Sequence, residues 1–143
     1  MSSFHHIGIF VSDLDHGKSH MSKLLGTQDV SKEILDENMG VQIVFLKDQQ
    51  ETLYELVAPY GGNSPVHGVF ARGKNILNHV AYVSDEFNKE IFRLRDEGCV
   101  PIGAPQAAKA FEGAKVIFFL TPLGFIFELI EGPLWSEIFL EVL

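Results

Sequence analysis

Cysteine is nearly absent from this chain, which contains Cys99 alone among its 143 residues. One cysteine cannot form a disulfide within the chain, so the fold does not depend on disulfide bridges. This usage is typical of proteins in a reducing cytoplasm, and we therefore expect a cytoplasmic location. We interpret Cys99 as a small buried residue and not as a nucleophile.

Positive charge and long apolar runs are also scarce. The chain has 11 Lys and Arg residues against 19 Asp and Glu, and its formal net charge is -8. Nucleic acids and acidic membranes are bound through clustered Lys and Arg, so we expect neither as a partner. The apolar stretches are short and interrupted, whereas a membrane-spanning helix needs about 20 residues.

The composition is otherwise that of an ordinary globular protein, with 46% hydrophobic and 21% charged residues. A chain of 143 residues is long enough to bury a core of its own. We therefore predict one domain over residues 1–143.

Two histidines and two glutamates recur at one spacing. His6 and His79 are 73 positions apart, and so are Glu55 and Glu128. Each histidine opens an alternating apolar run, and each glutamate lies inside one. A repeat that carries metal-ligand residue types in both copies predicts two modules that together build one His2Glu2 site.

Each copy has the pattern strand, helix and three strands. The first module, about residues 4–59, has a strand at 4–11, a helix that Ser12 caps and Gly26 ends, and strands at 27–34, 41–47 and 52–58. The second, about residues 77–132, has a strand at 77–83, a helix from Ser84 to Gly98, and strands at 100–102, 116–120 and 125–130. We expect a joint at 60–65, a short helix at 66–70, and an apolar tail at 133–143 that packs on the domain or on a partner chain.

The four repeated residues are candidate metal ligands because imidazole nitrogen and carboxylate oxygen both bind divalent transition metals. Taken singly, a strand histidine is more often structural and a strand glutamate more often exposed. The matched spacing favours a metal site instead, because a structural histidine and an exposed glutamate would both have to recur at the same offset by chance. His5 should point to the other face of its strand from His6, so we do not expect it to be a ligand.

Four segments resemble the vicinal oxygen chelate superfamily: HHIGIFVSDLDHGKSHMSKLLG, TLYELVAPYGGNSPV, LNHVAYVSD and VIFFLTPLGFIFELIEG. The methylmalonyl-CoA epimerase branch is the most similar. The resemblance implies an α+β fold in which two tandem βαβββ modules form a cup-shaped mixed sheet around a metal site. It also implies a divalent ion (Zn, Ni, Co, Mn or Fe) on His6, Glu55, His79 and Glu128, with Glu128 as a proton carrier.

The sequence also departs from the epimerase pattern. That branch has a second carboxylate on the strand before the first metal-binding glutamate, and here residues 41–45 contain no acid. Glu37, in the preceding turn, is the available substitute. Epimerisation needs a proton donor and an acceptor on opposite faces of the carbanion, so their absence would leave a one-base reaction or none.

We therefore expect a metal-dependent lyase or isomerase, of glyoxalase or methylmalonyl-CoA epimerase type, that acts on a small oxygen-rich substrate. The alternative is a non-catalytic ligand-binding or antibiotic-resistance protein, with a cup lined by Phe45, Tyr54, Phe118, Phe119 and Phe127. A third interpretation, an Fe(II) ring-cleaving dioxygenase, is disfavoured because those sites use two histidines and a single carboxylate. By analogy with the family, we also expect a homodimer.

Overall fold

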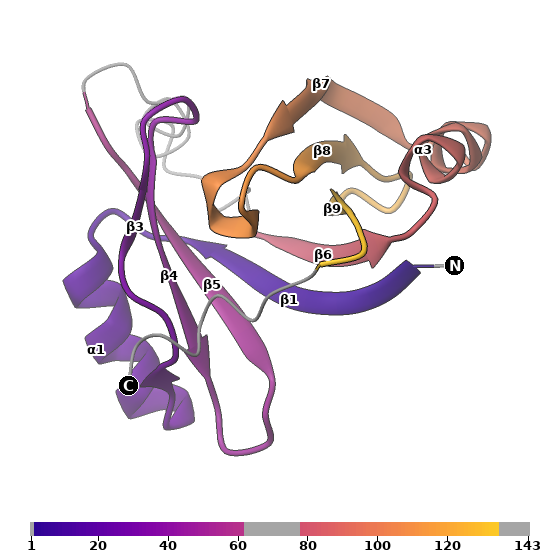
Figure 1. Cartoon of the computed structure of the whole chain (residues 1–143). Coiled ribbons are helices and arrows are strands. Elements are labelled where there is room, and N and C mark those ends of the chain that lie inside the picture. The colour runs from indigo at the N-terminus through magenta and orange to yellow at the C-terminus, as the bar shows by residue number, and fades with distance from the viewer. Residues whose placement is uncertain (1, 62–77, 135–143) are drawn as a thin grey trace.

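A mixed nine-stranded sheet runs through the residues that the computed structural model describes, 2–61 and 78–134 (Figure 1). The first half, residues 2–61, contains β1 (Ser2–Phe10), α1 (Leu14–Leu25), β2 (Gln28–Asp29), β3 (Ile34–Asp36), β4 (Val41–Lys47) and β5 (Leu53–Pro59). The second half, residues 78–134, contains β6 (His79–Ser84), α3 (Phe87–Asp96), β7 (Val100–Ala107), the 3-10 turn η1 (Lys109–Phe111), β8 (Lys115–Leu120) and β9 (Ile126–Glu131). The predicted α+β class is confirmed.

The two halves join edge to edge at the centre of the sheet. The strand order is β2-β4-β5-β1-β6-β9-β8-β7, and β3 also pairs with β4. β1 and β6 are antiparallel, whereas β5 lies parallel to β1 and β9 parallel to β6. Each half therefore repeats one βαβββ topology, and the first strands of the two copies form the seam.

Each helix covers the outer face of its own half. Leu14 and Met21 of α1 pack against Leu56 in one apolar cluster, and Phe87 and Leu94 of α3 pack with others in a second. Burying a side chain of this size stabilises the fold by about 1.5–3 kcal/mol. A third cluster draws on β4 and β5 and on η1, β8 and β9, so it joins the two halves on the inner side of the curled sheet.

Both helix starts differ from the prediction. The cap of α1 is Asp13 and not Ser12, because the Asp13 carboxylate accepts bonds from the backbone N–H groups of Asp15 and His16. Ser84 ends β6, and its hydroxyl accepts a bond from the backbone of Glu86, which is the cap residue of α3. The predicted stop of α1 at Gly26 is confirmed by a left-handed backbone with φ 67°.

Two predicted strands have different bounds. The strand expected at 27–34 is split into β2 and β3, because the Ser31 hydroxyl lies between them and accepts the backbone N–H of Phe45 at 2.8 Å. The strand expected at 100–102 continues to Ala107, with an irregularity in its pairing after Ile102.

Some predictions fall outside the described residues. These are most of the joint at 60–65, the short helix at 66–70 and nearly all of the tail at 133–143. Pro133 and Leu134 are described, and Leu134 packs against the cluster that joins the halves. No helix within 2–61 or 78–134 is both long and apolar enough to cross a membrane.

Candidate metal centre

Two rows of paired strand residues bring the predicted ligands together. In one row, Gly8 lies between Glu55 and His79. In the other, Ala81 lies between His6 and Glu128. Alternate residues of a strand share a face, so both rows project from the same side of the sheet. The four functional side chains therefore converge over Gly8 and Ala81.

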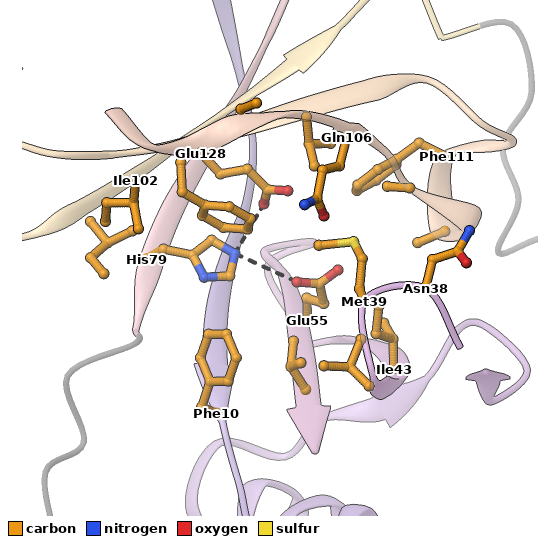
Figure 2. A pocket seen from close by; sticks show the side chains of 18 residues that line it. Phe10, Asn38, Met39, Ile43, Glu55, His79, Ile102, Gln106, Phe111 and Glu128 are labelled. Carbon is orange, nitrogen blue, oxygen red and sulfur yellow. Dashed lines mark ion pairs between the residues drawn. The ribbon is translucent and has the colours of Figure 1, made fainter. Parts of the chain in front are cut away.

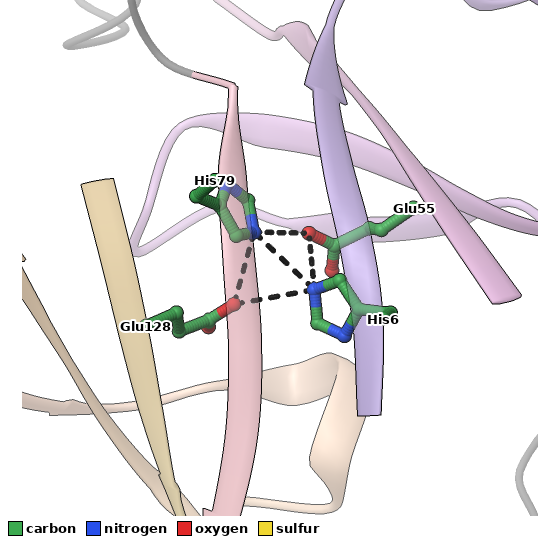
Figure 3. A group of neighbouring side chains, drawn as sticks. All are labelled: His6, Glu55, His79 and Glu128. Atoms are coloured by element: carbon green, nitrogen blue, oxygen red, sulfur yellow. Dashed lines mark hydrogen bonds and ion pairs between the residues drawn. The ribbon is translucent and has the colours of Figure 1, made fainter. Parts of the chain in front are cut away.

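The four ligand atoms lie at the spacing that a metal ion requires (Figure 3). The two Nε2 atoms are 3.2 Å apart. His6 Nε2 lies 3.4 Å from Glu55 Oε1 and 3.3 Å from Glu128 Oε1, and the distances from His79 Nε2 are 3.5 and 3.0 Å. Metal–ligand bonds of about 2.0–2.2 Å place neighbouring ligand atoms about 3–3.5 Å apart, which these five spacings match, and all four atoms lie within 4.8 Å of one another.

Burial strengthens the fit to a cation. The four residues are between 0% and 4% exposed. Glu128 Oε1 makes no hydrogen bond, although two imidazole nitrogens lie within 3.3 Å of it. The four ligand atoms therefore crowd around a common centre, where His6 Nε2 and His79 Nε2 also lie within hydrogen-bond distance of each other. An unsatisfied buried carboxylate oxygen is costly, and a divalent ion at that centre would remove the cost.

The pKa values of the four candidate ligands reflect how closely their ionisable groups lie. Burial raises the pKa of the Glu55 carboxyl, but the imidazoles of His6 and His79 together outweigh burial and hold that pKa below its usual range. Burial lowers the pKa of His79, and its ion pairs with Glu128 and Glu55 overcome this and raise it to about 10. Burial alone would raise the pKa of Glu128, but the imidazoles lower it. Burial alone would lower the pKa of His6, but the carboxylates raise it. A bound metal would have to displace protons from the imidazoles.

A pocket of about 300 Å³ opens beside the four residues (Figure 2). Glu55, His79 and Glu128 are among the 18 side chains that line it, whereas His6 is not. A ligand in this pocket would therefore reach the centre from the side of His79.

His5 is a functional candidate that the sequence interpretation placed wrongly. A register shift in the β1–β6 pairing between Phe4 and His6 interrupts the strand alternation. His5 Nδ1 consequently lies 2.8 Å from His6 Nδ1, and both rings contact Phe45 and Phe111. This contact uses the His6 nitrogen that faces away from the ligand cluster, so it can fix the ring tautomer.

Gly8 is a second residue that the prediction missed. A Cβ atom at this position would lie 1.9–2.4 Å from three ring atoms of His79. Only glycine leaves room for the His79 ring in its present position. The signal was available in the repeat, because the equivalent position in the second copy is the small residue Ala81.

Neither Glu37, the available substitute for a second acid, nor most of the predicted aromatic residues line the pocket. Glu37 is exposed and lines a separate depression with Asp36 and Lys109. Of the five predicted aromatic residues only Phe118 lines the pocket. The other four lie in the core or under the helices, namely Phe45, Tyr54, Phe119 and Phe127. Strand alternation explains the division between Phe118 and Phe119.

The fold and site define a class of protein: a paired βαβββ sheet whose inner seam carries a His/Glu group able to hold a metal ion. The chain belongs to the Glyoxalase/Bleomycin resistance protein/Dioxygenase superfamily, whose family model matches residues 5–118. The resemblance to the vicinal oxygen chelate superfamily is thus confirmed.

Solved structures with the same fold extend over most of the chain. The hypothetical protein BH1468 from Bacillus halodurans C-125 has a TM-score of 0.77 and 24% identity, and the match covers 95% of this chain and 98% of that one. Methylmalonyl-CoA epimerase from Mycobacterium tuberculosis has a TM-score of 0.71 and 23% identity, with 91% and 87% covered. Identities this low show the fold and not the activity.

One curated relative matches part of the sequence. It is the Bacillus subtilis (strain 168) protein named uncharacterized protein YqjC, which is 27% identical over 97 residues, 68% of each chain. Its name states no activity that could be carried over.

Proposed function

We propose that the chain is a metal-dependent lyase or isomerase, of glyoxalase or methylmalonyl-CoA epimerase type, that acts on a small oxygen-rich molecule. One observation carries the proposal: four buried ligand atoms of the types that bind divalent metals converge at the wall of a pocket. Family membership agrees with this chemistry but does not select among its reactions.

His6, Glu55, His79 and Glu128 would hold the ion, one of Zn, Ni, Co, Mn or Fe. When bound, the ion would accept two neighbouring substrate oxygens and stabilise negative charge that develops on them. Apolar side chains form most of the pocket wall beside the centre, and the two imidazoles lie against the carboxylates. Both modules are required, and we therefore treat residues 1–143 as one functional domain.

Glu128 is the proposed proton carrier. It lines the pocket, and its carboxylate could accept a proton from a substrate carbon when it leaves the ion. Within the described part of the chain, the only carboxylates that line this pocket belong to Glu55 and Glu128. A one-base reaction, in which one carboxylate removes a proton and returns it, is therefore favoured over a two-base epimerisation.

Hydrogen–deuterium exchange tests the proposal directly. Metal-loaded protein in D2O should exchange the proton next to a carbonyl in α-hydroxy ketones or 2-oxo aldehydes, as followed by NMR. Glu128→Gln should lose exchange while retaining a ligand oxygen, with metal content checked by elemental analysis. The proposal fails if metal-loaded protein catalyses no exchange across the panel, or if Glu128→Gln exchanges at the wild-type rate.

The second candidate is a non-catalytic ligand-binding or resistance protein. The lack of a further acid in the pocket favours it, because binding needs none. Saturable binding of a panel compound to metal-loaded protein, without exchange or turnover, would select this function.

We also propose a cytoplasmic homodimer. Exposed apolar side chains such as Leu123, Phe92 and Val100 support an interface between copies. Light scattering coupled to gel filtration should give twice the chain mass, and a monomer at micromolar concentration would contradict the proposal.

A further inference from the structure

Asp36 is a buried carboxylate outside the metal centre, and it connects the two modules. It ends β3 and is 3% exposed. Its Oδ1 accepts the backbone N–H of Met39 at 3.1 Å, in the turn between β3 and β4. Its Oδ2 accepts the backbone N–H of Lys109 at 3.0 Å, where η1 of the second module begins. A buried carboxylate is costly unless its oxygens are satisfied, so both bonds hold the side chain in place.

The bond to Lys109 joins equivalent positions of the two modules. Asp36 and Lys109 are 73 positions apart, which is the offset that relates the candidate ligands. The turns that follow are equivalent as well, because a glycine of positive φ lies four residues further on in each, Gly40 at 67° and Gly113 at 89°. A lysine side chain accepts no hydrogen bond, so Lys109 cannot return the bond that Asp36 makes. The first module therefore holds the turn of the second.

η1 extends this connection to the metal centre. Its last residue, Phe111, is 4% exposed and stacks on the His6 ring, with centroids 6.1 Å apart and planes 20° from parallel. The backbone N–H of Phe111 donates to the carbonyl of Ala108 at 3.1 Å, which closes the turn. The path from Asp36 to the His6 ring therefore runs through three consecutive residues, 109–111.

The same turns form part of the pocket wall. Met39 and Phe111 line the pocket together with Glu55, His79 and Glu128. A turn that loses its bond to Asp36 would consequently shift both the pocket wall and the ring that packs on His6.

We propose that Asp36 is a positioning residue of the metal centre: by holding the backbone of Lys109 it fixes η1, and η1 keeps the Phe111 ring against the His6 imidazole. Asp36 is not one of the four candidate ligands and acts on them through these neighbours. The role of His6 as a ligand rests on the proposed function, whereas the path from Asp36 to its ring rests on the described contacts.

NMR of the metal-free full chain tests this path without relying on a metal. A stacked aromatic ring shifts the signals of the protons that face it, so the His6 ring protons report the position of Phe111. We expect Asp36→Ala to move these signals in the direction in which Phe111→Leu moves them. Amide hydrogen exchange at Lys109 should become at least about tenfold faster, because its N–H loses its acceptor.

Asp48→Ala is the matched control. The Asp48 carboxylate also accepts two backbone N–H groups, those of Gln50 and Thr52, but all three residues lie in the turn between β4 and β5. This variant loses the same kind of bonds within one module, and it should leave the His6 ring signals in place.

Zinc affinity, measured by calorimetric titration, gives the functional readout. Asp36→Ala should weaken zinc binding about tenfold, the lower end of the loss typical of an outer partner, and Asp48→Ala should leave it unchanged. In a variant that combines Asp36→Ala with Phe111→Leu, the loss should be clearly smaller than the product of the two single losses, because both changes act on one path.

The inference is overturned if Asp36→Ala leaves the His6 ring signals unchanged, if Asp48→Ala moves them as far, or if the two single losses of zinc affinity multiply in the double variant. Should Asp36→Ala not fold, Asp36→Asn retains one acceptor oxygen and should give smaller changes of the same sign, and unchanged His6 signals there also overturn the inference. Failure of the wild type to bind zinc would contradict the proposed function, and the metal-free NMR comparison would still decide the role of Asp36.

Discussion

His6 and His79 occupy equivalent places in the two halves, yet their surroundings differ. His6 is fully buried, contacts His5 through its outer nitrogen and does not line the pocket. His79 lies over Gly8 and forms part of the pocket wall. The position equivalent to His5 in the second half is Asn78, whose side chain accepts the backbone N–H of Phe10 instead. The ligands are thus symmetric, while access to the two imidazoles is not: His6 is buried behind the centre, and His79, like both glutamates, forms part of the pocket wall.

Removing a carboxylate from either half should have the largest effect. We expect Glu55→Ala and Glu128→Ala each to weaken zinc binding more than about 100-fold, because loss of a ligand exceeds the roughly 10- to 100-fold loss typical of an outer partner. Calorimetric titration with Zn²⁺ measures this, and exposed Glu33→Ala is the control. Wild-type affinity in either ligand variant would contradict symmetric ligation.

Gly8→Ala should weaken zinc binding almost as much as the loss of a ligand does. The added methyl group cannot coexist with the present His79 ring, so the ring must turn away. We expect zinc binding to weaken up to about 100-fold, with destabilisation of about 1–3 kcal/mol from overpacking. Ala81→Gly is the matched change beside His6, and it removes a methyl group without a clash. Similar zinc affinities for the two variants would remove the distinction between the halves.

His5→Phe should weaken zinc binding about 10- to 100-fold, because the ring volume remains but the contact to His6 Nδ1 is lost. Asn78→Ala, at the equivalent position of the second half, should leave zinc affinity nearly unchanged. Nitrogen-15 NMR of the zinc-loaded wild type should show the His6 proton on Nδ1. An unchanged affinity in His5→Phe would assign His5 to packing alone.

The last prediction concerns pH. The pKa of His79 is raised from 6.5 to about 10, so its contribution to stability is complete below the unfolded value and is lost as pH rises toward 10. The melting temperature of the metal-free chain should therefore fall between pH 6.5 and 8.5 in chelator. Zinc affinity should rise over the same range, by at most about tenfold per pH unit for each proton displaced. His79→Gln should lose most of this dependence, and an identical pH profile would contradict the assignment.

The sequence predicted the repeated topology and the convergence of its ligands because both follow from residue patterns that the chain shows directly. Alternation places His6, Glu55, His79 and Glu128 on strand faces, and matched spacing requires equivalent places in both modules. The parallel pairing of β5 with β1 and of β9 with β6 then brings the ligands together.

The missed features depend on partners far away in the chain. The predicted strand at 27–34 is interrupted where the Ser31 hydroxyl accepts the backbone N–H of Phe45. His5 lies toward His6 because the pairing of β1 with β6 shifts register there. Gly8 is required by a ring 71 positions later. Alternation within one segment does not contain this information.

Anomalous X-ray diffraction from crystals saturated with zinc tests the central claim most directly. We predict one peak about 2.0–2.2 Å from Nε2 of His6, Nε2 of His79 and a carboxylate oxygen of each of Glu55 and Glu128. A saturated crystal with no peak among these four residues, or with its strongest peak elsewhere, would contradict the account.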